Sequence, residues 1–256
     1  SRVSLTSRAS RLMSTDLSFC DQLIVITGVG REGQVGEAVA RGFAQRGASL
    51  ALIDLNEQDP QRAATLTSLG AAHVSAHTAN LADAGDAQRV AAEVSWAHRD
   101  THVGRVHAVV CVAGGFGMTG ALDESDPEAW AKQFTINLET AFATTRAFLP
   151  SVRAAKGSFV YFGSVAATPG GSSRGMAAYA AAKSGVLSLM RTVALDEKAH
   201  GVRANAVAPT AIRTTTNVAD MGDKADYVER ESVADVVAFL ASPLARNVSG
   251  QTITLA

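Results

Sequence analysis

Short apolar segments alternate with longer stretches of helical periodicity along the chain. Seven of these segments are almost continuously hydrophobic and are too short for helices. Such runs are typical of strands buried on both faces, as in a parallel sheet. The predicted strands are Leu23–Thr27, Ser49–Asp54, His73–Ala79, His107–Val112, Ser158–Phe162, Val202–Ala208 and Thr252–Leu255.

The intervening stretches predict helices. Asp126-Pro127 marks one helix start, because Asp is a good N-cap and Pro suits the first helical position. Strand–helix alternation from end to end predicts an α/β protein with a doubly wound Rossmann fold, a mostly parallel seven-stranded sheet covered by helices on both faces. The predicted helices are Glu37–Arg46, Gln61–Leu69, Ala84–His98, Glu128–Leu149, Ala178–His200 and Val233–Ala241.

The first residues differ from the rest. Residues 1–12 are rich in Ser and Arg and contain no acid, a composition that suits a transit peptide or a disordered extension equally well. We favour the extension, since the segment has no amphipathic period. We therefore expect residues 1–20 to be an extension and residues 21–256 to form one domain that carries both the cofactor site and the catalytic site.

Composition narrows the function classes. A net charge of −1 gives no indication of nucleic-acid or anionic-membrane binding. The longest apolar runs are far too short to span a bilayer. Cys20 and Cys111 are too few for a disulfide framework, which favours a reducing compartment, so we expect a cytoplasmic protein.

A glycine-rich turn, Thr27-Gly28-Val29-Gly30-Arg31-Glu32-Gly33-Gln34-Val35-Gly36, follows the first strand and precedes a helix. Glycines let the backbone approach a pyrophosphate, and the following helix N-terminus offers free N–H groups to it. In this position the turn indicates a dinucleotide site.

Asp54 at the end of the second strand can accept hydrogen bonds from the adenosine ribose hydroxyls and would repel a 2′-phosphate. It favours NAD over NADP. Arg31 in the glycine loop could instead pair with that phosphate, so NADP stays open.

Tyr179 and Lys183 are four residues apart in an Ala-rich segment that should be helical, so their side chains leave one face of the helix. A nearby ammonium favours the phenolate, so we expect Lys183 to lower the pKa of Tyr179. Such a tyrosine could act as a general acid or base near neutral pH. The pair alone is a weak motif. Its place late in a chain that begins like a nucleotide-binding fold strengthens the catalytic interpretation.

The glycine loop, Asp54, Ser164, Tyr179 and Lys183 together resemble the short-chain dehydrogenase/reductase family, from about Leu23 to the C-terminus. Asn80-Leu81, Ala113-Gly114, Asn137 and the Pro209–Thr214 segment match further family motifs in the family's order. The resemblance implies a catalytic set of Asn137, Ser164, Tyr179 and Lys183. It implies cofactor contacts from Gly28, Gly30, Arg31, Gly33, Val35, Asp54, Leu55, Asn80, Leu81, Ala113, Gly114, Tyr179, Lys183, Pro209, Ile212 and Thr214.

The resemblance further implies hydride transfer between a nicotinamide cofactor and a small carbonyl compound or alcohol. Tyr179 would exchange the proton, Lys183 would hold the nicotinamide ribose, and Ser164 would bind the substrate oxygen. Asn137 would hold a water linking Lys183 to solvent. Relatives usually form dimers or tetramers through two long helices, so a homo-oligomer, a dimer or a homotetramer, is expected.

Several positions depart from the family pattern. The glycine loop is longer than usual, Cys111-Val112 replaces paired asparagines, and Thr210 stands where glycine is expected. The segment 215–231, where relatives carry a substrate-covering lid, is short. The loops expected to contact substrate are mostly apolar or small, which suits a neutral or mildly polar substrate; they are 116–118, 168–176 and 210–221.

Two alternatives are weighed against this interpretation. One is a dihydropteridine-reductase-like enzyme, suggested by the sequence at 111–115 and opposed by Ser164. The other is a non-catalytic NAD(H)-binding sensor or scaffold. A metal site is not expected, because His73 and His77 on one strand face would be ~13 Å apart. We expect His98, His102 and His107 to lie in a solvated loop.

Overall fold

The computed structural model describes residues 17–256. Most of the expected N-terminal extension therefore lies outside the described residues. The folded part begins before residue 21, because Phe19 is fully buried and its ring packs edge-on against Phe43 at 4.8 Å between centroids. The amide of Phe19 also donates to the carbonyl of Arg46 at 2.8 Å. The end of the expected extension is thus part of the core.

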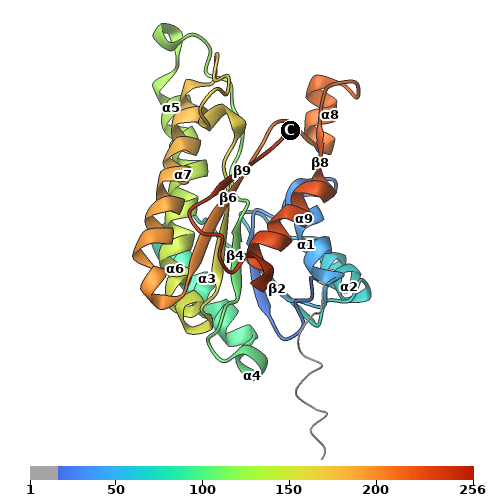
Figure 1. The fold of residues 1–256 in the computed structure, drawn as a ribbon. Helices are drawn as coiled ribbons and strands as arrows, with labels where there is room; N and C mark the ends of the chain where they lie inside the picture. The colour runs from blue at the N-terminus through green and yellow to red at the C-terminus, as the bar shows by residue number, and fades with distance from the viewer. Residues whose placement is uncertain (1–16) are drawn as a thin grey trace, which may run out of the picture.

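A seven-stranded sheet forms the centre of the molecule, with the order β3-β2-β1-β4-β5-β6-β9. All neighbouring strands run parallel (Figure 1). Five residues of β1 pair in register with β2, from Leu23 with Ser49 to Thr27 with Ile53. The predicted fold class and all seven strands are confirmed. The strands are β1 Leu23–Thr27, β2 Ser49–Asp54, β3 His73–Thr78, β4 Ala108–Cys111, β5 Ser158–Phe162, β6 Arg203–Pro209 and β9 Thr252–Leu255.

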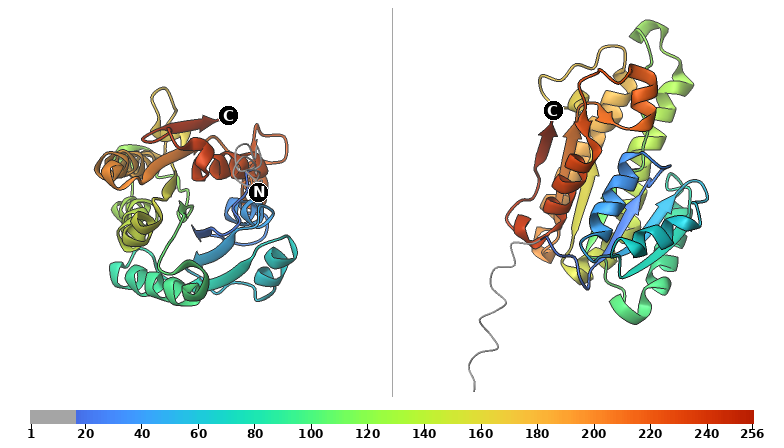
Figure 2. Two further views of the ribbon diagram at one scale, coloured as in Figure 1. Left: turned by 60° about the horizontal axis from the view of Figure 1, so that its bottom comes forward. Right: turned by 90° about the vertical axis from the view of Figure 1, so that its right-hand side faces the viewer.

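Helices cover both faces of the sheet (Figure 2). One buried cluster joins one face to α3, α6 and α7, through side chains such as Val90, Phe148 and Met190. A second cluster joins the other face to α1, α2 and α9, through side chains such as Phe43 and Leu66. The helices are α1 Val35–Ala44, α2 Gln61–Ser68, α3 Ala84–Ala97, α6 Thr140–Ala155, α7 Ala177–Asp196 and α9 Arg230–Ala241.

The predicted helix over residues 128–149 is interrupted. It consists of α5 Pro127–Phe134, a π-helical turn η2 at Thr135–Glu139, and α6. Asp126 caps α5 as predicted, because its carboxylate accepts from the amides of Glu128 and Ala129 at 3.3 and 3.0 Å. Single π turns inside α-helices often occur at functional sites.

Additional short elements were not predicted. They are α4 Arg99–His102, α8 Thr215–Met221, and a two-stranded sheet of β7 Ile212–Arg213 with β8 Val228–Glu229. The segment with the expected short lid thus contains a helix. In Figure 1, α8 lies at the end of the molecule where β9 and the C-terminus also end. The carboxyl ends of all seven parallel strands meet at this edge, where doubly wound sheets bind their ligands.

Candidate active site

The glycine-rich loop after β1 is shaped by close backbone contacts. Gly28 has φ +66°, and a Cβ there would lie 2.4 Å from Cα of Ala113 after β4. A Cβ on Gly36 would lie 2.3 Å from the carbonyl oxygen of Gly28, so the first turn of α1 presses against the loop. These contacts require glycine and place the N-terminus of α1, beginning at Val35, beside the loop. That is the arrangement needed to receive a pyrophosphate.

Asp54 at the end of β2 is tied to the same loop. Its carboxylate accepts from the amide of Gly30 at 2.8 Å and from the amide of Asn56 at 3.1 Å. A cavity of about 670 Å³ opens beside it, with Arg31 and Arg62 in its wall. A carboxylate retains further acceptor sites after these two bonds, so the cavity fits the adenosine part of a dinucleotide.

The loop also contacts α8 across the site. The amide of Thr215 donates to the carbonyl of Gly33 at 3.1 Å. The side-chain amide of Gln34 donates to the hydroxyls of Thr215 and Thr216 at 2.7 and 3.0 Å. The expected nicotinamide contact Thr214 is the N-cap of α8 and is bonded to the amide of Asn217. The segment after β6 therefore covers the glycine loop.

The expected adenine contacts lie at the ends of β2 and β3. Leu55 is 64% exposed, directly after Asp54. Leu81 is buried, and the Asn80 side chain accepts from the amide of Ala82 at 3.1 Å. Leu55 is therefore free to contact a ligand, whereas Leu81 is part of the core.

Lys183 on α7 is buried, and its ammonium donates to the carbonyl of Phe162 at the end of β5 at 2.9 Å. It lies 5.9 Å from the ring centroid of Tyr179, as the shared helix face predicted. The ring of Phe116 packs edge-on against Tyr179 at 5.2 Å between centroids. A Cβ on Gly114 would lie 3.4 Å from the Lys183 nitrogen, so the end of β4 adjoins this pair.

The expected lowering of the Tyr179 pKa is not found. Burial raises the pKa of Tyr179 above its usual value, and hydrogen bonding to Ser164 opposes that shift. Burial also lowers the pKa of Lys183 to about 8. The physical reason is that both groups lose water, while the ammonium is directed to a backbone carbonyl.

Ser164 begins a short 3₁₀ turn after β5, and its hydroxyl accepts from the amide of Ala166 at 3.3 Å. The Ser164 hydroxyl is also close enough to the phenol of Tyr179 to lower its pKa. The end of β5 and the first turn of α7 bring the two together, as the family resemblance implied.

Asn137 lies in the π turn and is buried. Its amide donates to the carbonyl of Gly115 at 3.0 Å, and its oxygen accepts from the amide of Gly115 at 3.2 Å. The amide also donates to the carbonyl of Gln133 at 3.0 Å. Asn137 thus fixes the chain after β4 beside Lys183.

Sequence reasoning missed two supporting residues. Gln133 lies one turn before Asn137, and its side-chain oxygen accepts from the Asn137 amide at 3.3 Å. Thr27 links β1 to β4, because its hydroxyl accepts from the amide of Ala113 at 3.3 Å. The four-residue spacing from Asn137 could have indicated Gln133. Thr27 begins the glycine-rich turn, but its role could not be predicted because its partner Ala113 is remote in sequence.

The remaining expected contacts lie at the end of β6 and directly after it. Pro209 is the last residue of β6, and Ile212 begins β7.

The two cysteines differ in their surroundings. Cys111 at the end of β4 is buried, and burial raises the pKa of its thiol to about 12, whereas Cys20 is exposed.

Residues 28–255 match the model of a family described as Enoyl-(Acyl carrier protein) reductase. A solved short-chain type dehydrogenase/reductase from Mycobacterium ulcerans superposes with a TM-score of 0.80 at 28% identity, over 93% of this chain and 89% of that one. The chain belongs to the short-chain dehydrogenase/reductase family. The resemblance that the motifs carried is confirmed.

Relatives in this short-chain dehydrogenase/reductase family have named activities. The chain is 34% identical to the 2-(S)-hydroxypropyl-CoM dehydrogenase 3 of Xanthobacter autotrophicus, over 76% of this chain and 73% of that protein. It is 31% identical to the meso-2,3-butanediol dehydrogenase of Serratia marcescens, over 93% and 94%. It is 30% identical to the galactitol 2-dehydrogenase of Rhizobium johnstonii, over 90% and 92%.

Membership of the short-chain dehydrogenase/reductase family confirms the predicted chemistry. The chain is an oxidoreductase that transfers a hydride between a nicotinamide cofactor and the carbonyl or alcohol group of a small molecule. When bound, the nicotinamide supplies the hydride chemistry, and the protein positions the reactants. Over residues 17–256, no helix is long and apolar enough to cross a membrane.

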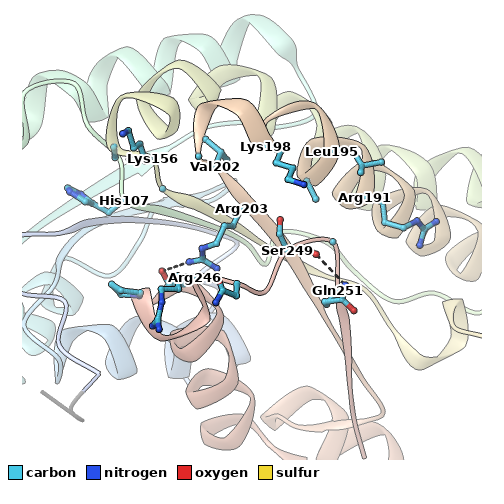
Figure 3. Close-up of a pocket in the computed structure, with 18 of the residues that line it drawn as sticks. His107, Lys156, Arg191, Leu195, Lys198, Val202, Arg203, Arg246, Ser249 and Gln251 are labelled. Carbon is cyan, nitrogen blue, oxygen red and sulfur yellow. Dashed lines mark hydrogen bonds between the residues drawn. The ribbon is translucent and has the colours of Figure 1, made fainter. Parts of the chain in front are cut away.

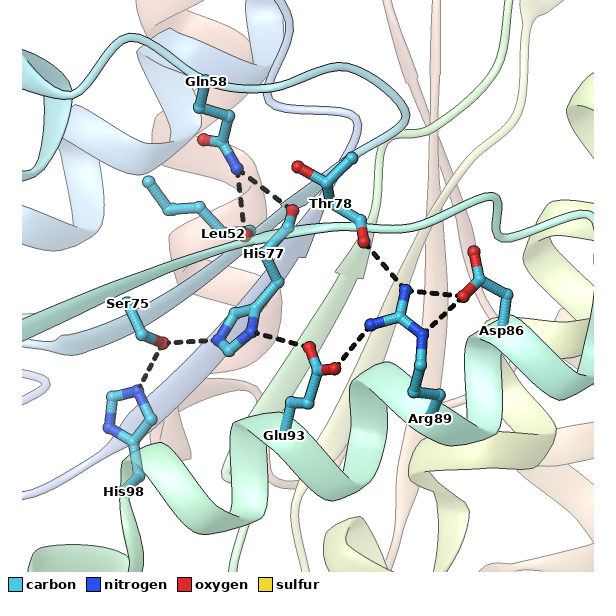
Figure 4. Close-up of polar contacts among 9 residues, drawn as sticks. All are labelled: Leu52, Gln58, Ser75, His77, Thr78, Asp86, Arg89, Glu93 and His98. Atoms are coloured by element: carbon cyan, nitrogen blue, oxygen red, sulfur yellow. Dashed lines mark hydrogen bonds and ion pairs between the residues drawn. The ribbon is translucent and has the colours of Figure 1, made fainter.

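The histidines are not in a solvated loop, and that expectation was wrong. His98 and His102 are buried at the end of α3 and in α4. His98 contacts His73 at 3.2 Å between Nδ1 atoms, and its Nε2 lies 2.9 Å from the hydroxyl of Ser75. That hydroxyl also contacts Nε2 of His77 at 2.9 Å (Figure 4). Within the described part of the chain no group of side chains suits a metal ion.

Proposed function

We propose that this chain is an NAD(H)-preferring dehydrogenase/reductase in which Tyr179 exchanges the proton that accompanies hydride transfer. The observation that carries the proposal is the convergence of Tyr179, Ser164 and Lys183 at the carboxyl edge of the sheet, next to the glycine loop. A proton donor, a hydroxyl and a cation within one buried region can stabilise charge on a reacting oxygen.

The roles follow from the environments. Ser164 lies beside the phenol of Tyr179 and lowers its pKa, which favours the charged form. Lys183 loses stabilisation by water on burial, so its ammonium gains most from new acceptors such as ribose hydroxyls. Asn137 acts through Gly115 as a positioning residue, holding the segment that borders Lys183.

Asp54 supports the preference for NAD. Its carboxylate faces the cavity after β2, where a 2′-phosphate would add negative charge beside it. Arg31 and Arg62 in the same cavity are the groups that would admit NADP.

The substrate proposed is a neutral or mildly polar alcohol or ketone. Phe116 and Met118 after β4 are 62% and 60% exposed, and the Phe116 ring touches Tyr179. An exposed apolar wall beside the proton donor suits an uncharged substrate. The relatives named for butanediol and galactitol act on such alcohols.

As in the family, we propose that the chain forms a homo-oligomer, assembled through α5, α6 and α7. We also propose a cytoplasmic location.

Tyr179→Phe tests the proposal, because it removes the hydroxyl and leaves the ring. We expect kcat to fall by about 10²–10⁴. NADH affinity, measured by fluorescence quenching, should stay within about threefold. Tyr161→Phe is the matched control: it removes a buried hydroxyl bonded to Thr145 in the core and should retain turnover.

Turnover by the wild type and by Tyr179→Phe should be screened with several ketones, several secondary alcohols and a quinonoid pterin, each with NADH or NAD⁺ and with NADPH or NADP⁺. Near-normal turnover by Tyr179→Phe would overturn the role of the tyrosine. Turnover of the pterin alone would favour the dihydropteridine-reductase alternative. Binding of NADH without turnover of any compound would favour the sensor.

A further inference from the structure

A second large cavity lies at the opposite edge of the sheet from the active site. It has a volume of about 1040 Å³. Its wall contains residues that directly precede five strands, so it is at the amino edge of the sheet. Those residues are Gln22, His107, Gly157, Val202 and Gln251. None of the expected cofactor or catalytic residues lines it.

The charge in this wall has a single sign. Five cationic side chains line the cavity, and no Asp or Glu does. They come from the end of α6, from α7 and its following turn, from β6, and from the loop after α9, and Figure 3 shows them around the hollow. They are Lys156, Arg191, Lys198, Arg203 and Arg246. Glu197, near Lys198 in sequence, is held elsewhere by Arg153 through two bonds of 2.6 Å.

Helix capping explains only part of this charge. Arg203 donates to the carbonyls of Leu240 and Ala241 at 2.7 and 3.2 Å and so caps the end of α9. The other four side chains make no hydrogen bond or ion pair with the rest of residues 17–256. The ends of α6, α7 and α9 point to this edge, and each contributes roughly −0.5 charge. Their sum is well below the charge of five cations.

We propose that this cavity binds a small molecule carrying two or more phosphate groups. A single phosphate would engage only one part of the wall, whereas cations from several segments match a ligand with separated charges. The volume suits a small organic ligand. Nucleic acid is disfavoured, because the wall has no Phe, Tyr or Trp for base stacking and the chain has a net charge of −1.

The test uses inorganic pyrophosphate and tripolyphosphate in calorimetric titrations of the intact protein at constant ionic strength. Saturating NAD⁺ keeps these anions from the glycine loop. We expect binding by the wild type, tighter for tripolyphosphate than for orthophosphate. Arg191→Gln combined with Arg246→Gln should weaken it at least about tenfold, through loss of two charge-assisted contacts. NADH binding and turnover should be unchanged, which separates this site from the proposed catalytic function.

Arg99→Gln combined with Arg105→Gln is the matched control, since it removes the same charge from exposed positions outside the cavity. Lys198→Gln supplies an independent third probe of the cavity. Equal binding by both double variants would overturn the proposal, as would no binding by the wild type. Binding of RNA or of anionic lipid vesicles in place of pyrophosphate would also overturn it.

Discussion

At the scale of single residues, Gly28 is a position that only glycine can occupy without rearrangement. A side chain there would meet the backbone of Ala113 at 2.4 Å, and φ is +66°. We expect Gly28→Ala to destabilise the protein by at least about 1–3 kcal/mol. It should also weaken NADH binding, because the loop and the end of β4 must separate.

Urea unfolding with and without NADH measures both effects. Gly42→Ala in α1 is the control, since its added methyl would meet the flexible end of Arg46 at 3.3 Å and the Cβ of Ala234 at an ordinary contact distance of 3.6 Å. That variant should be stabilised by about 0.5–1 kcal/mol. Equal behaviour of the two variants would contradict the role assigned to Gly28.

Asp54 carries the proposed cofactor preference. Asp54→Asn keeps the shape of the side chain and removes the charge beside the proposed ribose position. We expect the ratio of kcat/KM for NADH over NADPH to fall at least about tenfold, since repulsion of the 2′-phosphate is lost. Steady-state kinetics with both cofactors measures it, and an unchanged ratio would assign the choice to Arg31 and Arg62.

The sequence correctly predicted the relative positions of residues whose roles depend on spacing along a helix. It did not predict properties that depend on the surroundings of a side chain, such as its pKa. Tyr179 and Lys183 share a helix face because they are four residues apart. The predicted lowering of the Tyr179 pKa was wrong, because burial raises that pKa by more than the neighbouring Ser164 lowers it. Burial arises from packing of remote segments, which spacing does not show.

At the scale of elements, the π turn η2 is important because it places Asn137 against the backbone of Gly115. Asn137→Ala would leave the amide and carbonyl of Gly115 without partners. We expect destabilisation by about 1–3 kcal/mol and a fall in kcat as the segment beside Lys183 loosens. Thr140→Ala, which removes a hydroxyl bonded within the helix, is the control and should retain kcat. Thermal unfolding and kinetics give the two readouts, and an unaffected kcat in Asn137→Ala would exclude the positioning role.

The five inner strands β1, β2, β4, β5 and β6 were predictable because burial on both faces makes them almost continuously apolar. The π turn was not, because Thr135–Glu139 contains no residue that breaks a helix. The helix α8 was missed because Thr215–Met221 is mostly polar and has no apolar face. Thr214 before it is a good N-cap residue and was the one available signal.

At the scale of the whole molecule, the histidine network should make stability sensitive to acid. It joins β3 to α3, and the groups facing His98 are His73, Ser75 and His102, while Glu93 faces His77. Burial and the neighbouring histidines lower the pKa of His98 to about 4.

Below its usual value of 6.5 the unfolded chain protonates at His98 before the folded one does. Stability is therefore lost as pH falls from about 6.5 towards 4. We expect Tm to drop over this window, by about 2–4 °C for each kcal/mol lost. His98→Gln should reduce the slope of Tm against pH, measured by calorimetry between pH 4 and 7.5. An unchanged slope would place the acid sensitivity in other groups.

The contrast between the two cysteines has a practical consequence. Cys111 lies inside the sheet with a thiol that stays protonated, whereas Cys20 is on the surface. A maleimide dye applied at neutral pH would therefore attach to one sulfur only, near the start of β1 and away from the strand ends that carry the catalytic groups. These 256 residues therefore offer a single attachment point for an optical reporter, with no cysteine engineering needed.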